Sequence, residues 1–316
     1  MLKIGLVGVG GISGAHIPVW DQMEDAELIC LCDIRPERME NYKDTKHCYT
    51  DFDEMLANEK IDILDICLPT YLHADFAVKA MEKGINVITE KPISLKEEDV
   101  ERVYSTAEKN GVKFMVAQVL RFWPEYLILK DIFDTQKYGK LLSGSMIRLG
   151  GYPRWSWDNW MMDEKRSGLT PYDLHIHDLD FMVYAFGIPK VRHQYRSKQP
   201  DQDFISVDYD FGEFSIHSEA SWYGARYPFT AEFRFQFENA VVANEHGSIK
   251  VYGRDEDDVI DLTEVAEGDT GKINLPKSNA YANEILYFAD CVKNNKPVEK
   301  VKPVELQSVI QILNSL

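Results

Sequence analysis

The sequence predicts an α/β fold in which a doubly wound parallel sheet is followed by a second, α+β domain with a large, mostly antiparallel sheet. Three observations predict it. The length of 316 residues suits about two domains, at roughly 150 residues each. Residues 1–120 alternate short apolar runs with helical patterns, and residues 191–260 contain alternating segments separated by turn residues.

The first 120 residues are typical of repeated strand–helix units. Such alternation requires crossover connections, and these produce a parallel sheet. Gly84 and Gly111 follow two of the helical stretches, where a left-handed helix end favours glycine. The expected strands are Lys3–Val7, Glu27–Cys32, Ile61–Leu68, Ile85–Thr89 and Val112–Val116. The expected helices are Ser13–Met23, Pro36–Lys43, Leu72–Lys83 and Leu95–Asn110.

The pattern changes near residue 121, which predicts domains over residues 1–120 and 121–316. A helix is expected over residues 122–137, a strand over Leu141–Leu149 and a further helix over Thr170–Phe186. The alternation that follows favours a largely antiparallel sheet. Its clearest segments are Phe204–Phe211, Ser215–Trp222, Ala231–Phe237 and Ile249–Tyr252, and two helices, Tyr281–Asn294 and Pro303–Ser315, end the chain.

The charge balance disfavours several classes of partner. The chain has 35 basic and 52 acidic residues, a formal net charge of −17. A surface this acidic repels nucleic-acid phosphates and anionic lipid, although a local basic patch is compatible with it. No run approaches the roughly 20 apolar residues of a membrane helix. We therefore expect no nucleic-acid partner and no membrane partner.

The cysteines and the start of the chain favour a reducing compartment. The five cysteines are odd in number and form no Cys-x-x-Cys pair, which argues against a disulfide framework and against a zinc site. We therefore expect no metal. No charged leader with an apolar core precedes the first strand, so we expect a cytoplasmic protein.

A glycine-rich loop follows the first expected strand and opens the first expected helix. Glycines at this place allow a tight turn and a close approach of the backbone to a pyrophosphate, which the N–H groups of the helix then bind. The strand-loop-helix context makes the motif more specific than a glycine pattern alone. The predicted cofactor-binding residues here are Gly8, Gly10, Gly11, Ile12 and Ser13.

A carboxylate ends the second expected strand, about 20 residues after the glycines, where a ribose-binding acid is expected. This residue is Asp33, and Ile34 and Arg35 follow it. A carboxylate accepts hydrogen bonds from both ribose hydroxyls and repels a 2′-phosphate, so NAD is favoured. NADP stays an alternative, because the Arg35 guanidinium is a suitable partner for that phosphate. A polar residue that merely opens a loop is the structural alternative for Asp33.

The sequence Glu90-Lys91-Pro92 follows the strand Ile85–Thr89, at the sheet edge where doubly wound sheets bind ligands. Proline restricts the residue before it to an extended conformation, so Lys91 is expected on a short rigid corner. A lysine held beside a nicotinamide can pass a proton to or from a hydroxyl. A surface lysine is the ordinary alternative.

A second candidate site lies in the helix expected over Thr170–Phe186. Asp173 and His177 are four residues apart and would share one helix face. That face could present an acid–base histidine with a carboxylate beside it, although an acid at this position also suits a helix cap. His175 would point about 200° away from His177, which favours a place in the core.

These motifs resemble the Gfo/Idh/MocA family, named after glucose–fructose oxidoreductase and inositol dehydrogenase. The resemblance covers essentially the whole chain and implies a Rossmann domain followed by a C-terminal domain with an open sheet. It implies that Lys91 is catalytic, that Asp173 is its partner and that His177 is the acid–base histidine. The cofactor pocket would also be lined by Pro69, Thr70, His73 and Glu90. In two departures, Ser13 replaces the third glycine, and the chain ends at Leu316, where many relatives continue.

The expected function is an NAD(P)-dependent dehydrogenase. It would transfer a hydride between nicotinamide and a secondary alcohol or carbonyl of a carbohydrate-like small molecule, namely a sugar, polyol or cyclitol. One alternative is a hydrolase or lyase that retains NAD and oxidises its substrate transiently. Another is a non-catalytic sensor of NAD or a sugar. The free face of the antiparallel sheet favours a homodimer or homotetramer.

Overall fold

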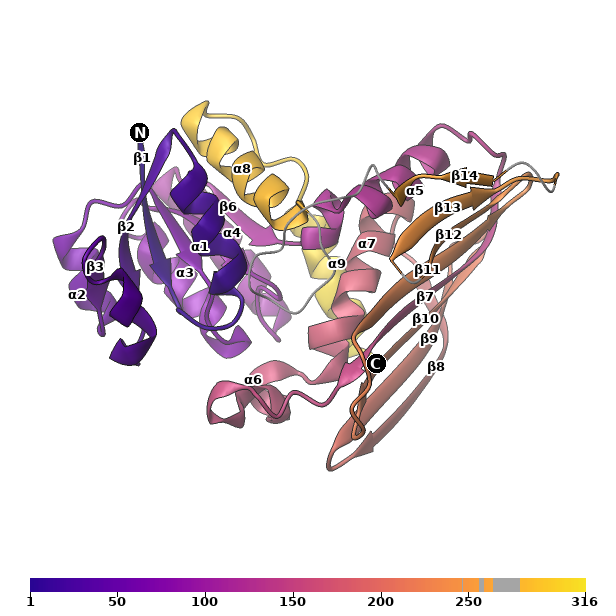
Figure 1. The fold of residues 1–316 in the computed structure, drawn as a ribbon, viewed down its shortest axis with the longest axis horizontal. Coiled ribbons are helices and arrows are strands. Elements are labelled where there is room, and N and C mark those ends of the chain that lie inside the picture. Colours follow the sequence, from indigo (N-terminus) through magenta and orange to yellow (C-terminus); the bar gives the residue numbers. More distant parts are fainter. Residues whose placement is uncertain (246, 256–258, 264–278) are drawn as a thin grey trace. The chain divides into compact units, whose positions relative to one another are not determined.

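The computed structural model describes residues 1–245, 247–255, 259–263 and 279–316, and their contacts define two compact units (Figure 1). The first unit contains Met1–Gln118 and Tyr281–Pro303. The second contains the described parts of Val119–Asp269 and Leu275–Ala280, together with Val304–Leu316. Because these units interleave along the chain, the expected domain boundary between residues 120 and 121 stays a prediction.

The first unit is built on a six-stranded parallel sheet, as predicted. Its strand order is β3-β2-β1-β4-β5-β6, so the order reverses between β1 and β4. Ligands of such sheets bind beyond the carboxyl ends of the strands at this reversal. The strands are β1 (Leu2–Val7), β2 (Ala26–Cys32), β3 (His47–Tyr49), β4 (Ile63–Ile66), β5 (Asn86–Glu90) and β6 (Phe114–Ala117).

Helices connect these strands. They are α1 (Ser13–Gln22), α2 (Phe52–Asn58), α3 (His73–Met81) and α4 (Glu97–Asn110). The left-handed Gly111 ends α4, as expected. Pro36–Tyr42 forms 3-10 turns instead of the expected α-helix, and the sequence analysis missed β3 and α2, whose short patterns gave no periodic signal.

The helix α8 (Ala280–Lys293) belongs to the first unit from Tyr281 onward. Its buried face carries Glu284, Ile285 and Phe288, each with no exposed surface. An ion pair between Lys293 and Asp25 connects its last turn to the loop before β2. A segment late in the sequence therefore completes the core of the N-terminal sheet.

The second unit is built on an eight-stranded sheet of order β14-β13-β12-β11-β7-β10-β9-β8. Among the described strands, β7 and β10 pair in parallel and the other neighbours pair antiparallel, which confirms the expected mostly antiparallel sheet. The strands are β7 (Leu141–Gly151), β8 (Lys190–Gln199), β9 (Gln202–Asp210), β10 (Ser215–Tyr223), β11 (Thr230–Phe237), β12 (Val241–Glu245), β13 (Ser248–Tyr252) and β14 (Val259–Asp261).

Helices cover one face of this sheet, as Figure 1 shows for α5 (Pro124–Asp134) and α7 (Ile176–Phe186). Along β10, Ile216 and Ala220 are fully buried while the alternate residues Ser215 and His217 are exposed. The opposite face of this strand is therefore polar. The remaining described helices are α6 (Glu164–Ser167) and α9 (Pro303–Asn314).

The helix expected over Thr170–Phe186 is not uniform. Pro171–His175 forms a π-helical turn, and the α-helix α7 begins at Ile176. A π-turn has a wider hydrogen-bond spacing than an α-helix, so the four-residue rule used for Asp173 and His177 does not hold across it. In the part of the chain that the structure describes, no helix has the length and apolar character that a membrane span requires.

Candidate functional site

The glycine loop after β1 has two different kinds of glycine. Gly8 has a φ of +92°, and a Cβ there would lie 2.5 Å from the carbonyl oxygen of Cys67, so only glycine fits. A Cβ on Gly10 or Gly11 would meet no atom within 4 Å. The first glycine thus allows the chain to turn against β4, while the other two border open space that a phosphate group can occupy.

The start of α1 accepts serine in place of the third glycine. The Ser13 hydroxyl donates to the carbonyl oxygen of Gly10 at 2.8 Å, and Ser13 is 2% exposed. The N-cap residue, Ile12, provides no side-chain cap. The small Ser13 side chain therefore hydrogen-bonds the loop to the first turn of α1 and adds little bulk. This explains how serine is accepted at the third glycine position.

The carboxylate of Asp33 connects the end of β2 to the glycine loop. Its Oδ2 accepts a hydrogen bond from the backbone N–H of Val9 at 2.9 Å. Its Oδ1 accepts from the backbone N–H of Arg35 at 2.9 Å and from that side chain's Nε at 3.1 Å. The exposed Ile34 lies between them. The residues predicted to bind ribose and pyrophosphate are thus brought together in one hydrogen-bonded group.

His73 has a structural role that the sequence analysis did not predict. Its ring is 1% exposed, with Nδ1 2.6 Å from the carbonyl oxygen of Pro92 and Nε2 2.7 Å from that of Leu68. Burial lowers the pKa of His73, and the two carbonyl oxygens oppose this shift. His73 therefore joins the segments that follow β4 and β5. Pro69 and Thr70 lie in the first of these segments.

Glu90 and Lys91 lie at the carboxyl end of β5, as predicted. Glu90 Oε2 accepts a hydrogen bond from the backbone N–H of Lys91 at 3.1 Å, and Glu90 Oε1 lies 3.1 Å from Nε2 of His16. Lys91 is half-buried, and the peptide bond between Lys91 and Pro92 is cis. The extended backbone expected for Lys91 stays a prediction.

Two functional candidates in the first unit escaped the sequence analysis. His16 in α1 and Glu284 in α8 are fully buried close to Glu90. Asp65, an acid inside the apolar strand β4, bonds to His16 and is fully buried as well. A charged residue within a buried strand pattern was a usable signal, because such a residue requires a partner.

In the second unit, the structure places Asp173 in the π-helical turn and His177 in the first turn of α7. Both are half-buried, so each keeps some access to solvent. Their roles in proton transfer stay a prediction.

His175 lies in the core of the second unit, as expected. It is fully buried, with Nε2 2.7 Å from the Tyr209 hydroxyl and Nδ1 3.3 Å from the Ser218 hydroxyl. Burial lowers its pKa to about 3, helped by the positive charge of Arg148. The ring is therefore neutral at physiological pH and packs as a polar core residue.

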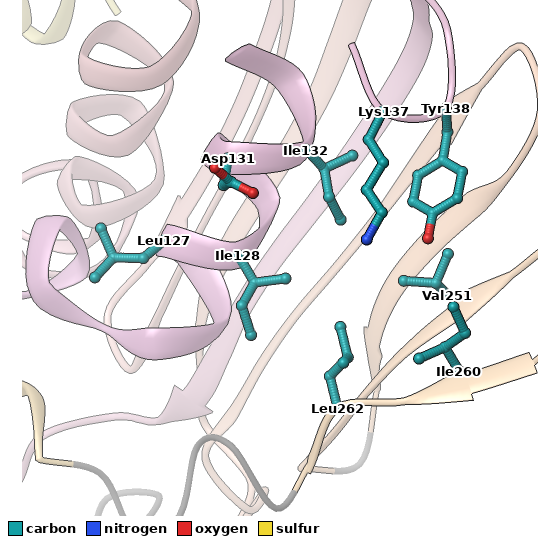
Figure 2. Close-up of a pocket in the computed structure, with 9 residues that line it drawn as sticks. All are labelled: Leu127, Ile128, Asp131, Ile132, Lys137, Tyr138, Val251, Ile260 and Leu262. Carbon is teal, nitrogen blue, oxygen red and sulfur yellow. The ribbon is translucent and has the colours of Figure 1, made fainter. Parts of the chain in front are cut away.

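The second unit also contains a hollow of about 320 Å³. Figure 2 shows Ile128 and Ile132 of α5 facing Val251 of β13 and Ile260 of β14. Its described lining is mainly apolar and includes none of the predicted site residues. This hollow is therefore separate from the residues to which the motifs assign chemistry.

Comparison with known proteins identifies the family to which the first 118 residues are similar. Residues 2–118 match the oxidoreductase family GFO_IDH_MocA, described by its NAD-binding Rossmann fold. The chain is 26% identical over 264 residues to a 2,7-anhydro-N-acetylneuraminate hydratase from Mediterraneibacter gnavus, covering 79% of this chain and 68% of that protein. It is 27% identical over 207 residues to glucose-6-phosphate 3-dehydrogenase from Bacillus subtilis, covering 63% and 57%.

The fold is shared with solved structures over the full chain. A 3-ketoreductase from Actinomadura kijaniata, solved with NADP and TDP-benzene, has a TM-score of 0.84 at 14% identity and covers 100% of this chain and 96% of that one. Aligned regions span between half and about two thirds of the curated relatives named first. The N-terminal part of the chain, residues 2–118, belongs to the GFO_IDH_MocA family of oxidoreductases and has its NAD-binding Rossmann fold.

Proposed function

We propose that the protein is a dehydrogenase that oxidises a secondary alcohol, or reduces the corresponding carbonyl, on a sugar, polyol or cyclitol. The observation that carries this proposal is the hydrogen bond of 2.9 Å between Asp33 Oδ2 and the backbone N–H of Val9. It joins the glycine loop to a carboxylate at the carboxyl end of β2, which is the arrangement that holds the adenosine half of a dinucleotide.

The residues around the glycine loop fit NAD. Gly10 and Gly11 leave space for the pyrophosphate, and Asp33 offers two carboxylate oxygens to the ribose hydroxyls. A bound nicotinamide cofactor supplies hydride transfer. Because Arg35 already pairs with Asp33, NADP is the less favoured cofactor. Arg35 would have to leave that carboxylate to bind a 2′-phosphate.

Proton transfer is assigned to this chain's own side chains. Lys91 follows Glu90, and the hydrogen bond from its backbone to Glu90 Oε2 fixes the peptide from which the ammonium group extends. We assign to Lys91 Nζ the transfer of the substrate's hydroxyl proton. His177 is the second candidate for this role, and Asp173 is the carboxylate that would support it.

A substrate screen tests the proposal. Purified protein is mixed with NAD and a panel of polyols, cyclitols and sugars, and the absorbance of NADH is followed. We expect turnover with at least one secondary alcohol. Lys91→Ala should remove it, whereas Lys96→Ala, which replaces an exposed lysine five residues away, should not. Turnover that survives Lys91→Ala within about threefold of wild type would contradict the assignment.

A second candidate function is a reaction without net oxidation. The similarity to the hydratase from Mediterraneibacter gnavus, 26% identity over a region that covers 79% of this chain, favours it. In that case NAD remains with the protein during purification and the substrate changes while total NADH stays constant. Chromatography of the acid-extracted nucleotide, together with product analysis, separates this candidate from the dehydrogenase.

We also propose that the protein is a cytoplasmic homodimer or homotetramer. The five cysteines are free, three of them within parallel strands and a fourth just after one, which suits a reducing compartment. The sheet of the second unit has a polar face along β10 that helices leave uncovered. Light scattering at micromolar concentration tests the assembly, and a strictly monomeric mass would contradict it.

A further inference from the structure

A buried polar cluster lies behind Glu90 in the first unit. It consists of His16 from α1, Asp65 from β4, Glu90 from β5 and Glu284 from α8. His16, Asp65 and Glu284 have no exposed surface, and Glu90 is 8% exposed. Three carboxyl groups thus surround one imidazole in the protein interior. A buried charge without a compensating partner costs several kcal/mol there.

Hydrogen bonds connect three of these groups to one another. Asp65 Oδ2 accepts from the indole N–H of Trp20 at 2.7 Å and lies 2.9 Å from His16 Nδ1. Glu90 lies 3.1 Å from His16 Nε2 through one oxygen and accepts from the Lys91 backbone through the other. A neutral imidazole has one N–H, so His16 can donate to both carboxylates only as the imidazolium. Burial opposes that charged form, but the Asp65 carboxylate raises the pKa of His16 well above its usual value.

Glu284 differs from the other two acids. Neither of its oxygens has a hydrogen-bond partner among the described residues. Its carboxyl group lies near Glu90, because one ligand atom from each of His16, Glu90 and Glu284 lies within 4.8 Å of the other two. That span is within the reach of a direct contact after a small side-chain shift, or of a hydrogen bond through one water. A protonated Glu284 has an O–H group that can donate a hydrogen bond. Protonation also removes a negative charge that no neighbouring group offsets.

We propose that Glu284 is a positioning residue: a neutral carboxylic acid that holds the Glu90 carboxylate in place and, through Glu90, the Lys91 peptide. The significance for Lys91 chemistry rests on the proposed function, whereas the protonation of Glu284 does not. This arrangement extends the site from the carboxyl edge of the sheet to α8. Glu284 of that helix lies 194 positions after Glu90 in the sequence.

The surroundings of Glu284 support the proton. Burial raises the pKa of Glu284 well above its usual value, and the negative charge of Glu90 raises it further. Asp65 of β4 acts in the same direction, and the positive His16 of α1 opposes them. On α8 itself, the ring centroid of Tyr281 lies 6.1 Å from that of His16, so an aromatic ring also borders the cluster.

Infrared spectroscopy tests the proton without any substrate. At pH 7, wild-type protein should show a C=O stretching band of a protonated carboxyl group that Glu284→Gln removes. Glu125→Gln is the matched control, because Glu125 is a second buried acid with a raised pKa but lies in the second unit. It should leave the Glu284 band unchanged. Wild-type and Glu284→Gln spectra that are identical in this region would overturn the proposal.

Metal analysis separates the proposal from its main competitor. His16, Glu90 and Glu284 are also a plausible ligand set for a divalent cation, with Asp65 behind the histidine. If Glu284 holds a proton, purified protein contains no stoichiometric zinc or manganese, and Glu284→Gln preserves the fold. A bound metal at one equivalent that Glu284→Gln eliminates would overturn the proposal.

Kinetics test the positioning role once a substrate is found. Glu284→Gln keeps a neutral donor of the same shape, so kcat and its pH profile should stay within about twofold of wild type. Glu284→Ala removes the donor, and kcat should fall about ten- to a hundredfold, with a smaller change in the Kd for NAD. Equal losses in both variants would exclude a neutral donor, and no loss in either would exclude positioning.

Discussion

Two fully buried histidines, one in each unit, bond through both ring nitrogens, and the two are in different charge states. His16 of the first unit faces two carboxylates, Asp65 and Glu90. His175 of the second faces two hydroxyl groups, those of Tyr209 and Ser218. Burial lowers both pKa values, but the Asp65 carboxylate outweighs this effect at His16, whose pKa is raised well above 6.5. The groups that bond to each ring, and not its burial, therefore decide the charge of the histidine.

The buried acids of the two units differ in the same way. In the second unit, Arg148 pairs with Asp178 and Arg121 pairs with Asp180, each through two hydrogen bonds. The Arg148 guanidinium thus offsets the charge of Asp178, and the Arg121 guanidinium is shared between Asp180 and Glu305. In the first unit, the acids outnumber the cations, so a proton must complete the balance. We interpret the second arrangement as structural and the first as part of the reacting site.

The largest effect is expected for Lys91, which adjoins the network of the first unit. Lys91→Ala should lower kcat by about 10²–10⁴-fold, because a positioned proton-transfer group is lost. The melting temperature and the Kd for NAD should change little, since the glycine loop and Asp33 hold the cofactor. Steady-state rates, thermal melting and fluorescence titration measure the three quantities. A large loss of stability in this variant would show that Lys91 is structural.

Replacing Arg148 should have the opposite effect: a large loss of stability in place of a loss of kcat. Arg148→Met leaves Asp178 buried without its cation, and the free energy of unfolding should fall by about 3–5 kcal/mol. The double variant Arg148→Met/Asp178→Leu removes both charges and should recover most of this loss. Denaturant unfolding followed by circular dichroism measures it. Equal stability of the single and double variants would contradict a charge effect.

Asp33 should control the choice of cofactor. Wild-type protein should bind NAD more tightly than NADP, because the carboxylate accepts from the ribose hydroxyls and repels a 2′-phosphate. Asp33→Ala should weaken NAD binding by about 1.5–3 kcal/mol, the usual loss for a hydrogen bond to a charged group. It should also free Arg35, so NADP binding should improve. Fluorescence titration with both cofactors measures this, and an equal or tighter wild-type affinity for NADP would show that Arg35 dominates.

The sequence predicts those parts of the site that are local along the chain. The glycine loop, Asp33 and Glu90 follow strands whose apolar patterns are clear, so their place at one edge of a parallel sheet was predictable. Five strands of the parallel sheet and the mostly antiparallel character of the second sheet were predictable for the same reason. Short elements such as β3 and α2 were not, because a few residues give no reliable periodicity.

Long-range contacts account for most of what the sequence did not predict. Glu284 meets Glu90 only because α8 returns to the first unit, and no spacing rule connects residues so far apart. His73 follows a predicted motif, yet its contact with the Pro92 carbonyl depends on the path of a second loop. The π-helical turn around Asp173 is similar, since helix patterns do not distinguish it from an α-helical turn.

The last expected effect is a pH dependence of stability, to which His16 and His175 contribute with opposite signs. His175 is neutral in the folded protein, so its contribution is present above pH 6.5 and is lost as the pH falls toward about 3. His16 is charged in the folded protein, so its contribution is present below pH 6.5 and is lost as the pH rises toward its raised pKa. Glu284 keeps its proton only when folded, which also lowers stability as the pH rises above 4.5. Above pH 6.5 the free energy of unfolding should therefore fall by up to about 1.4 kcal/mol per pH unit for each retained proton. The melting temperature should fall with it. The double variant His16→Gln/Glu284→Gln should flatten this decline, and a wild-type melting temperature that rises from pH 6.5 to 8.5 would contradict the assigned charges.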